Sequence, residues 1–220
     1  MNSTNIGNVT IEWLGHAGFV LRGQGHVVYI DPYVIPDVIK YEDQADLLLI
    51  THEHSDHCYP ESIRKIRKSD ATTLIPESCS LQFRGDARRI KEGDMLNGDL
   101  AIKGMEIEIV AAYNKGKPFH PRGIGVGYII GIAGKKIYHA GDTDLIPEMD
   151  NISVDVALLP IGGTSTMDVA EAAEAAARIH PKVAIPMHYN CVDGTGADPE
   201  VFKELVRDKA PDVDVIILQA

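Results

Sequence analysis

The chain has 220 residues, of which 45% are hydrophobic and 24% are charged, a balance typical of a soluble globular protein with a sizeable core. Its formal net charge of −11 disfavours a dedicated nucleic-acid-binding surface, because an acidic protein repels the phosphate backbone. No apolar run approaches the roughly 20 residues that cross a bilayer, which argues against a membrane-spanning helix.

The cysteine content and the first residues indicate where the protein works. Cys58, Cys79 and Cys191 are an odd and sparse set, which predicts no disulfide framework. The first residues contain neither a basic segment nor an apolar one, so they do not resemble a signal peptide. We therefore expect a cytoplasmic protein with a single domain over residues 1–220. The sequence is compatible with both a monomer and a homo-oligomer.

Short apolar runs that are rich in β-branched residues and bounded by Gly, Pro, Asn or Asp predict strands along the whole chain. In order, these runs are Val9–Leu14, Gly18–Leu21, His26–Ile30, Leu47–Ile50, Thr73–Ile75, Leu100–Val110, Val126–Ile132, Lys136–Tyr138, Val154–Leu159, Val183–Pro186 and Val213–Leu218. Helices are predicted at Pro60–Lys68, Met167–His180 and Pro199–Lys209, the second with Ser165 or Thr166 as its N-cap.

The order of these elements favours an α/β fold with two sheets. Strands with hairpin-like turns crowd the first third of the chain, whereas strands followed by helices dominate the last third. This order predicts two β-sheets packed face to face, with helices on the outside. A single doubly wound sheet is the alternative, although no Gly-x-Gly-x-x-Gly segment opens a first helix.

The most informative stretch runs from His52 to His57 and reads HEHSDH, directly after the apolar run Leu47–Ile50. Imidazole nitrogen and carboxylate oxygen are the donors that first-row divalent metals take from proteins. An ordinary solvated loop is built instead from Gly, Asn, Asp, Ser and Pro. The stretch therefore predicts a metal site at the end of a strand.

Further metal-type ligands follow later strands. His120 lies between two predicted strands, Asp142 follows the strand Lys136–Tyr138, and His188 follows the strand Val183–Pro186. Active sites of α/β proteins are usually assembled where several strands end at one edge of a sheet. We therefore expect these three side chains to lie near the HEHSDH stretch.

The pattern His-x-His-x-Asp-His resembles the signature of the metallo-β-lactamase superfamily and matches it without departure at His52, His54, Asp56 and His57. The resemblance begins at residues 12–19, which read EWLGHAGF, and continues to His188, so it covers nearly the whole chain. Within the superfamily the chain is most similar to small prokaryotic metal-dependent hydrolases related to ascorbate-6-phosphate lactonase. The resemblance implies a four-layer αββα sandwich.

The resemblance also implies a site for two divalent metal ions, each held by three side chains. The ligands of the first ion would be His52, His54 and His120. Those of the second would be Asp56, His57 and His188, with Asp142 bridging both ions. Zinc suits the imidazole-rich set, and manganese or iron is the alternative because the aspartates add hard oxygen donors. Two metals about 3.5–4 Å apart can activate a bridging hydroxide, with Asp56 as a catalytic proton shuttle.

Several residues near the predicted site have two interpretations. Asn114 competes with His120 for the first metal, and we favour His120 because imidazole is the better donor. Asp31 either accepts a hydrogen bond from a ligand imidazole or caps its strand. His16 either lies close to the ligands or orders its own turn. His139 faces either the site or the core.

The substrate class is left open by the sequence. The loop Gly162–Ser165 joins a strand to a predicted helix N-terminus, and Lys115, Lys117 and Arg122 lie near His120, which suggests a small substrate carrying a phosphate or carboxylate. An ordinary loop with solvated basic side chains is the alternative.

The ligand set favours a hydrolase that cleaves an ester, lactone or phosphodiester bond in a small molecule. A Glu in place of His54 would have indicated the di-iron redox branch of the superfamily. Two other classes remain as alternatives: an iron-dependent oxidoreductase or sulfur-transfer protein on the same scaffold, and a non-catalytic metal-binding protein. The acidic balance of the chain disfavours a nuclease.

Overall fold

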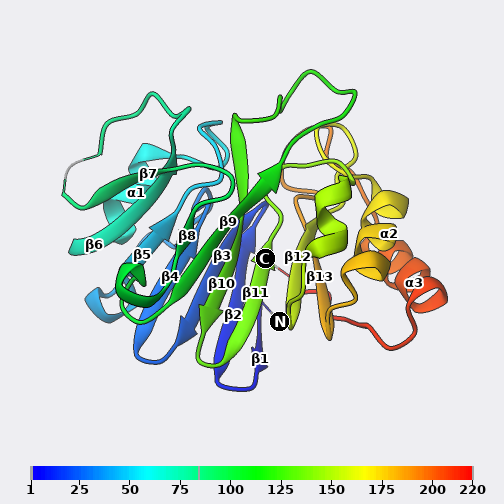
Figure 1. Cartoon of the computed structure of the whole chain (residues 1–220), viewed down its shortest axis with the longest axis horizontal. Helices are drawn as coiled ribbons and strands as arrows, with labels where there is room; N and C mark the ends of the chain where they lie inside the picture. The colour runs from blue at the N-terminus through cyan, green and yellow to red at the C-terminus, as the bar shows by residue number, and fades with distance from the viewer. Residues whose placement is uncertain (1, 84, 220) are drawn as a thin grey trace.

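The computed structural model describes residues 2–83 and 85–219, and within these ranges it contains two seven-stranded β-sheets (Figure 1). The strands of sheet A are β1 (Ser3–Ile6), β2 (Val9–Gly15), β3 (Gly18–Gly23), β4 (His26–Ile30), β5 (Ala45–Leu49), β6 (Arg67–Pro76) and β7 (Ala87–Ile90). The strands of sheet B are β8 (Met95–Leu96), β9 (Glu106–Ala112), β10 (Gly125–Ile132), β11 (Lys135–His139), β12 (Val156–Pro160), β13 (Val183–Met187) and β14 (Asp214–Val215).

Both sheets connect their strands in the same way. In sheet A the neighbours from β1 to β4 are antiparallel, and those from β4 to β7 are parallel. In sheet B the neighbours from β8 to β11 are antiparallel, and those from β11 to β14 are parallel. Each half of the chain therefore builds one sheet with hairpins first and crossover connections later.

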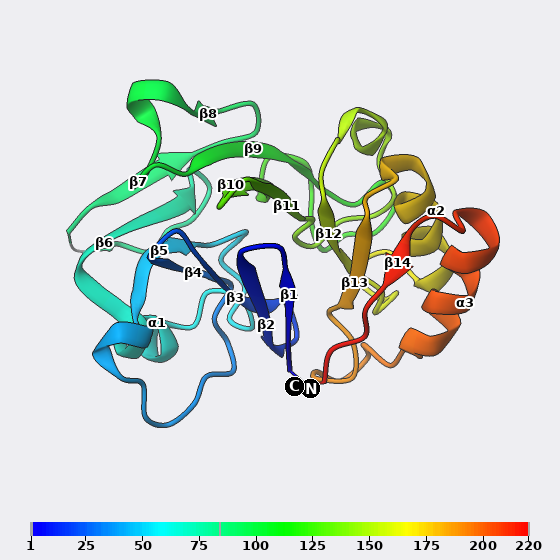
Figure 2. The same cartoon turned by 90° about the horizontal axis from the view of Figure 1, so that it is seen from below.

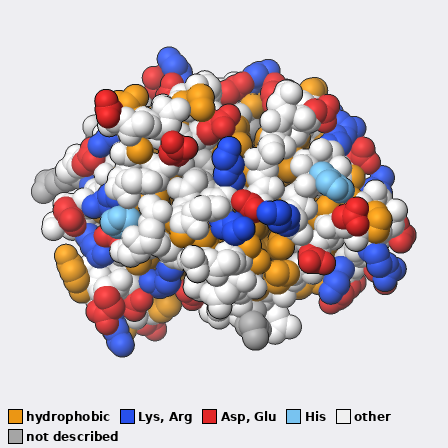
Figure 3. Space-filling view, turned by 60° about the horizontal axis from the view of Figure 1, so that its bottom comes forward, with side chains coloured by type: hydrophobic (Ala, Val, Ile, Leu, Met, Phe, Trp, Pro, Cys, Tyr) orange, Lys and Arg blue, Asp and Glu red, His pale blue; other side chains and the backbone are white. Residues whose placement is uncertain are grey.

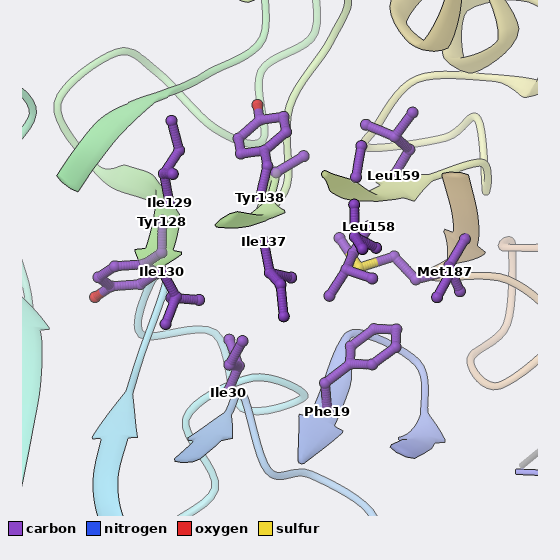
Figure 4. Packing of buried hydrophobic residues seen from close by; sticks show 14 of the residues in the cluster. Phe19, Ile30, Tyr128, Ile129, Ile130, Ile137, Tyr138, Leu158, Leu159 and Met187 are labelled. Carbon is purple, nitrogen blue, oxygen red and sulfur yellow. The ribbon is translucent and has the colours of Figure 1, made fainter. Parts of the chain in front are cut away.

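The core lies between the two sheets. Phe19 of β3 and Ile30 of β4 point towards Ile130 and Ile137 of sheet B, and all four are essentially inaccessible to solvent (Figure 4). Neighbouring residues such as Ile129 point to the opposite face of sheet B, as the two-residue period of a strand requires. Burying one such side chain contributes roughly 1.5–3 kcal/mol, so the facing layers hold the sheets together.

Helices cover the outer faces of both sheets. The helix α1 (Pro60–Ile66) buries Ile63 and Ile66 in a second apolar cluster on sheet A. The helices α2 (Val169–Ile179) and α3 (Pro199–Lys209) pack on the other side of the molecule, with Phe202 fully buried (Figure 2). The layers therefore follow the order α, β, β, α, which confirms the predicted sandwich and excludes the single doubly wound sheet.

The helix ends differ from the predicted ones for local reasons. The N-cap of α2 is Asp168 rather than Ser165 or Thr166, because its side chain accepts a hydrogen bond of 2.8 Å from the N–H of Glu171. The Glu171 carboxylate accepts in turn from the Asp168 N–H, which completes a capping box. The helix α1 ends at Ile66, two residues earlier than predicted.

Some strands also differ from the prediction. The predicted run Leu100–Val110 starts too early, because Gly98–Leu100 forms a 3₁₀ turn, η2, and β9 begins at Glu106. The strands β1, β7 and β8 were not predicted, since they are short and carry few apolar residues. The predicted final strand is reduced to β14. Two further 3₁₀ turns are η1 (Tyr41–Asp43) and η3 (Pro147–Asn151).

Charged side chains of both signs lie on the surface of the molecule. On the face shown in Figure 3, acidic and basic side chains are interspersed and form no extended basic area. Among the described residues, no helix has the length and apolarity needed to cross a membrane.

Candidate metal centre

The side chains predicted as ligands lie where strands of both sheets end. The HEHSDH stretch follows β5, His120 lies in the segment between β9 and β10, Asp142 follows β11, and His188 follows β13. Two further residues, His16 in the β2–β3 turn and Asp31 after β4, come from the same edge. Most of these side chains are buried, whereas His54 is exposed and Asp56 is half-buried.

Three imidazoles form the first group. The Nε2 atoms of His52 and His120 lie 3.0 Å and 3.2 Å from Nδ1 of His54. A zinc–nitrogen bond of about 2.0–2.1 Å with tetrahedral angles places the ligand nitrogens about 3.3 Å apart. The spacing of the three nitrogens is therefore close to that of three ligands around one metal ion.

Asp142 lies between this group and a second one. Its Oδ2 is 3.0 Å from Nε2 of His188 and 3.5 Å from Nε2 of His120, and its Oδ1 is 3.5 Å from Nε2 of His57. Asp56 completes the second group, with Oδ2 3.9 Å from Nε2 of His57. The Asp142 carboxylate thus lies near nitrogens of both groups, which is the position that the predicted bridging ligand would need.

The Asp31 carboxylate orients His57 and, through Thr51, His52. Asp31 Oδ2 accepts hydrogen bonds from Nδ1 of His57 at 2.8 Å and from the Thr51 hydroxyl at 2.5 Å. Because the single hydroxyl proton of Thr51 goes to Asp31, Thr51 can only accept from Nδ1 of His52, 3.0 Å away. Both rings therefore carry a proton on Nδ1 and turn Nε2 towards the site.

Asn114 orients the ring of His120 by hydrogen bonding. Its Oδ1 accepts from the His120 N–H at 3.0 Å and lies 3.2 Å from Nδ1 of the ring, while the Ser165 carbonyl lies 3.1 Å from the same Nδ1. Both neighbours of Nδ1 are acceptors, so Nδ1 is the donor and Nε2 is unprotonated. Asn114 turns its amide nitrogen towards Asp144 and Ser165, away from the cluster. The structure thus brings His120, and not Asn114, among the predicted ligands.

The interior of the site holds several polar atoms without a hydrogen-bond partner. Within the described residues these are Nδ1 of His16, Nε2 of His57, Oδ1 of Asp142 and both ring nitrogens of His188. A buried polar group without a partner costs about 1–3 kcal/mol. A bound cation would provide the partner, and a set of imidazole nitrogens and carboxylate oxygens fits a divalent metal.

The charges of the site suit metal binding. Burial lowers the pKa of His52 well below its ordinary value, and burial also lowers the pKa of His120. Burial acts to raise the pKa of Asp142, yet His188 and His57 outweigh it and lower that pKa well below its ordinary value. Neutral imidazoles and an ionised carboxylate are the protonation states that metal ions require. His57 is the exception: burial opposes its protonation, but the carboxylates of Asp142 and Asp31 raise its pKa to about 9, so a bound metal ion would have to displace the proton from its Nε2.

Three residues of this edge adopt a left-handed backbone conformation. The φ angles are 53° at His16, 43° at Asp31 and 57° at His188. This conformation costs of order 1–3 kcal/mol in a residue other than glycine, and it is concentrated at functional sites. In each case it redirects the chain as a strand ends, so that the side chain points into the cluster. The packing at this edge therefore stabilises three strained backbone conformations, and these conformations place the side chains in the cluster.

The structure brings all seven predicted ligands to one place and resolves two of the open interpretations. Asp31 accepts a hydrogen bond from a predicted ligand imidazole. His139 lies in the core, where Nε2 donates to the Ala17 carbonyl at 2.9 Å and Nδ1 accepts from the Gly141 N–H at 3.2 Å. The sequence reading missed Thr51, although its place directly before His52 was a usable signal.

Two of the three basic residues proposed for anion binding, Lys117 and Arg122, are paired with carboxylates. Nζ of Lys117 lies 2.8 Å from Asp144, and Arg122 pairs with Glu92 and, at 2.9 Å, with Glu148. The helix α2 is already capped by Asp168. These contacts favour the structural interpretation of Lys117 and Arg122.

Comparison with known proteins gives consistent matches. Residues 10–188 match the family model described as "Beta-lactamase superfamily domain". The chain is 37% identical over 221 residues to a metal-dependent hydrolase of Thermococcus kodakarensis, with 96% of each chain covered. It is 39% identical over 211 residues to a metal-dependent hydrolase of Thermoplasma acidophilum, covering 90% of this chain and 91% of the relative.

Solved structures show the same similarity. Igni18, described as a novel metallo hydrolase from Ignicoccus hospitalis, superposes with a TM-score of 0.79 at 31% identity, over 96% of this chain and 95% of its own. The diiron β-hydroxylase CmlA from Streptomyces venezuelae superposes with a TM-score of 0.72 at 17% identity, over 98% of this chain and 54% of its own. The second likeness shows a shared fold alone.

Proposed function

This chain belongs to the β-lactamase superfamily and is a metal-dependent hydrolase, and on that premise we propose that it works with two divalent metal ions. One ion would be held by His52, His54 and His120. The other would be held by Asp56, His57 and His188, with Asp142 between them. Zinc is the proposed metal, because imidazoles outnumber carboxylates in this set.

One observation carries the proposal. His52 and His120 each donate Nδ1–H away from the site, so both turn an Nε2 lone pair inwards, 3.0 Å and 3.2 Å from Nδ1 of His54. A proton on Nδ1 of His54 can be donated in full to only one of these two acceptors, whereas one cation can bind all three nitrogens. This convergence of imidazole nitrogens favours a metal ion over a structural cluster of histidines.

The proposed reaction is the hydrolysis of an ester, lactone or phosphodiester in a small molecule. When bound, two divalent ions supply Lewis acidity and lower the pKa of bound water towards about 7. The side chain of Asp56 is 29% exposed at the edge of the site, so it can meet both the substrate and solvent. Burial acts to raise its pKa, but the His16 hydrogen bond and the charge of His57 lower it. Asp56 is therefore ionised, the state in which it could hold a cation, and we propose that it also passes on the proton that the attacking water loses.

The test combines elemental analysis with a substrate panel of lactones, phosphodiesters and thioesters. We expect two equivalents of zinc in the purified wild type and metal-dependent turnover of at least one class. Asp142→Ala should lose metal and turnover, whereas Asp155→Ala, which changes an aspartate paired with Lys182, should lose neither. Competition by inorganic phosphate would favour an anionic substrate.

Other results of these measurements would contradict the proposal. A single equivalent of metal would refute the dinuclear site. Bound iron with colour and redox activity would favour an oxidoreductase or sulfur-transfer protein. Two tightly bound metals without turnover of any substrate would favour a non-catalytic metal-binding protein.

A further inference from the structure

His16 occupies a position that the proposed ligand set does not explain. It lies in the turn between β2 and β3, and its ring is inaccessible to solvent. Its carbonyl accepts hydrogen bonds from the Trp13 indole at 2.9 Å and from the His188 N–H at 2.8 Å. Its own N–H donates to Sγ of Cys191 at 3.1 Å. The turn of sheet A is thus docked on the segment that follows β13 of sheet B.

The ring of His16 holds the carboxylate of Asp56. Nε2 of His16 lies 2.9 Å from Oδ2 of Asp56, and a carboxylate can only accept, so Nε2 carries the proton. The two residues are 40 positions apart in sequence, and the bond joins the β2–β3 turn to the loop after β5. Asp56 is the most solvent-exposed member of the second group, so it has the most freedom to turn away when this bond is lost.

The same ring packs against the other two members of the second group. Its centroid lies 3.9 Å from that of His188 and 5.1 Å from that of His57. Among the described residues, the side-chain partners of His16 are Asp56, His57, His188 and Tyr33, and none of the three imidazoles of the first group is one of them. His16 therefore contacts the residues of the second proposed metal site.

We infer that His16 is a positioning residue, which holds Asp56 in place by a hydrogen bond so that the second metal ion is bound. The inference rests on the proposed dinuclear site. A carboxylate ligand that is itself hydrogen-bonded keeps its orientation, and loss of such a partner typically weakens metal binding about 10–100-fold. Removing the His16 donor should therefore weaken the second metal by that factor and leave the first unchanged.

The experiment compares His16→Gln with His16→Leu. Gln places an N–H group near the position of Nε2 and keeps the donor, whereas Leu removes it. Both residues lack the ring and have a Cβ, so both face the same backbone cost at a φ of 53°. His26→Leu is the matched control, because His26 lies in sheet A and pairs with Asp46.

The readout is metal binding by titration of metal-free protein with zinc or cobalt, followed by elemental analysis after dialysis. We expect two equivalents in the wild type and in His26→Leu. His16→Leu should retain the tighter equivalent and bind the other about 10–100-fold more weakly. His16→Gln should recover most of that loss. Circular dichroism spectra verify the fold of each variant.

A double-mutant cycle with Asp56→Asn separates the mechanisms. If His16 acts through Asp56, then His16→Leu adds little to the loss caused by Asp56→Asn. Additive losses would overturn the inference and indicate that His16 binds the metal or acts through His188. Wild-type binding by His16→Leu, or no rescue by His16→Gln, would also overturn it. A wild type with a single metal equivalent would instead refute the dinuclear site itself.

Discussion

Replacement of Asp31 by Asn should invert the proton positions of two proposed ligands at once. Asp31 Oδ1 accepts from the Thr51 N–H at 2.8 Å, while Oδ2 accepts from the Thr51 hydroxyl and from His57. An Asn would keep its side-chain oxygen in the place of Oδ1, where it accepts from the Thr51 N–H. Its NH2 group in that place would set two donors against each other. The two amide protons would then point at Oγ1 of Thr51 and at Nδ1 of His57.

The consequences follow from the hydrogen-bond inventory of these groups. A donor at Nδ1 of His57 moves the ring proton to Nε2, where it blocks the lone pair. The Thr51 hydroxyl, now an acceptor from Asn, would donate to His52 and move the proton of that ring to Nε2 as well. Each proposed metal site would lose one correctly protonated ligand. A disturbed partner of this kind costs about 10–100-fold in metal affinity, or about 1.4–2.7 kcal/mol per site.

The assay is zinc affinity by competition with a chromophoric chelator, with imidazole nitrogen NMR to report the tautomers of the metal-free protein. Asn tolerates the left-handed conformation found at residue 31, so the substitution should not disturb the backbone. Asp46→Asn is the control, since Asp46 is also buried and also accepts a backbone N–H, from Val27 at 2.8 Å. Wild-type affinity and unchanged tautomers in Asp31→Asn would refute the argument.

Three further predictions follow from the same structure. Chelation of the metal should lower the melting temperature, by about 5–10 °C if the metal is present at 100 times its Kd, because that binding stabilises the fold by about 2.7 kcal/mol. His120→Ala should lose one equivalent of metal or most of its affinity, and wild-type metal content by elemental analysis would move the ligand assignment elsewhere. Burial acts to raise the pKa of Asp46, but hydrogen bonds from Lys68 and Val27 lower it. Asp46→Asn should therefore lose about 1–2 kcal/mol of stability in urea unfolding of the metal-free protein at neutral pH. That difference should persist above about pH 4, the ordinary value for Asp, and shrink as the pH falls through the lowered folded-state pKa.

Local patterns were enough to identify the chemistry and the architecture. The HEHSDH stretch after an apolar strand predicts a metal site, because the donor types and their spacing lie within six consecutive residues. Apolar runs bounded by turn residues predict the strands, and Phe19 and Ile30 lie in two of these runs with side chains that point into the core (Figure 4). Two sheets follow from the order of hairpins and helices. These properties depend on residues that are neighbours in sequence.

Tertiary structure decided the elements and contacts that depend on distant segments. The end of α1 is one case: Arg67 and Lys68 continue a helical pattern, yet they belong to β6, where Arg67 pairs with Ala45 of β5. The choice between Asn114 and His120 is another, because Asn114 is turned away by Asp144 and Ser165, which lie 30 and 51 positions further along the chain.

The sequence by itself determined that this chain is a metal-binding sandwich, because metal donors and strand periodicity are short-range features. Only the folded structure decided how the side chains proposed to bind metal are held. Asp31 is 26 positions from His57, and His16 is 40 positions from Asp56. No local pattern encodes such pairs, since the distance between their side chains is set by how the strands of sheet A lie side by side.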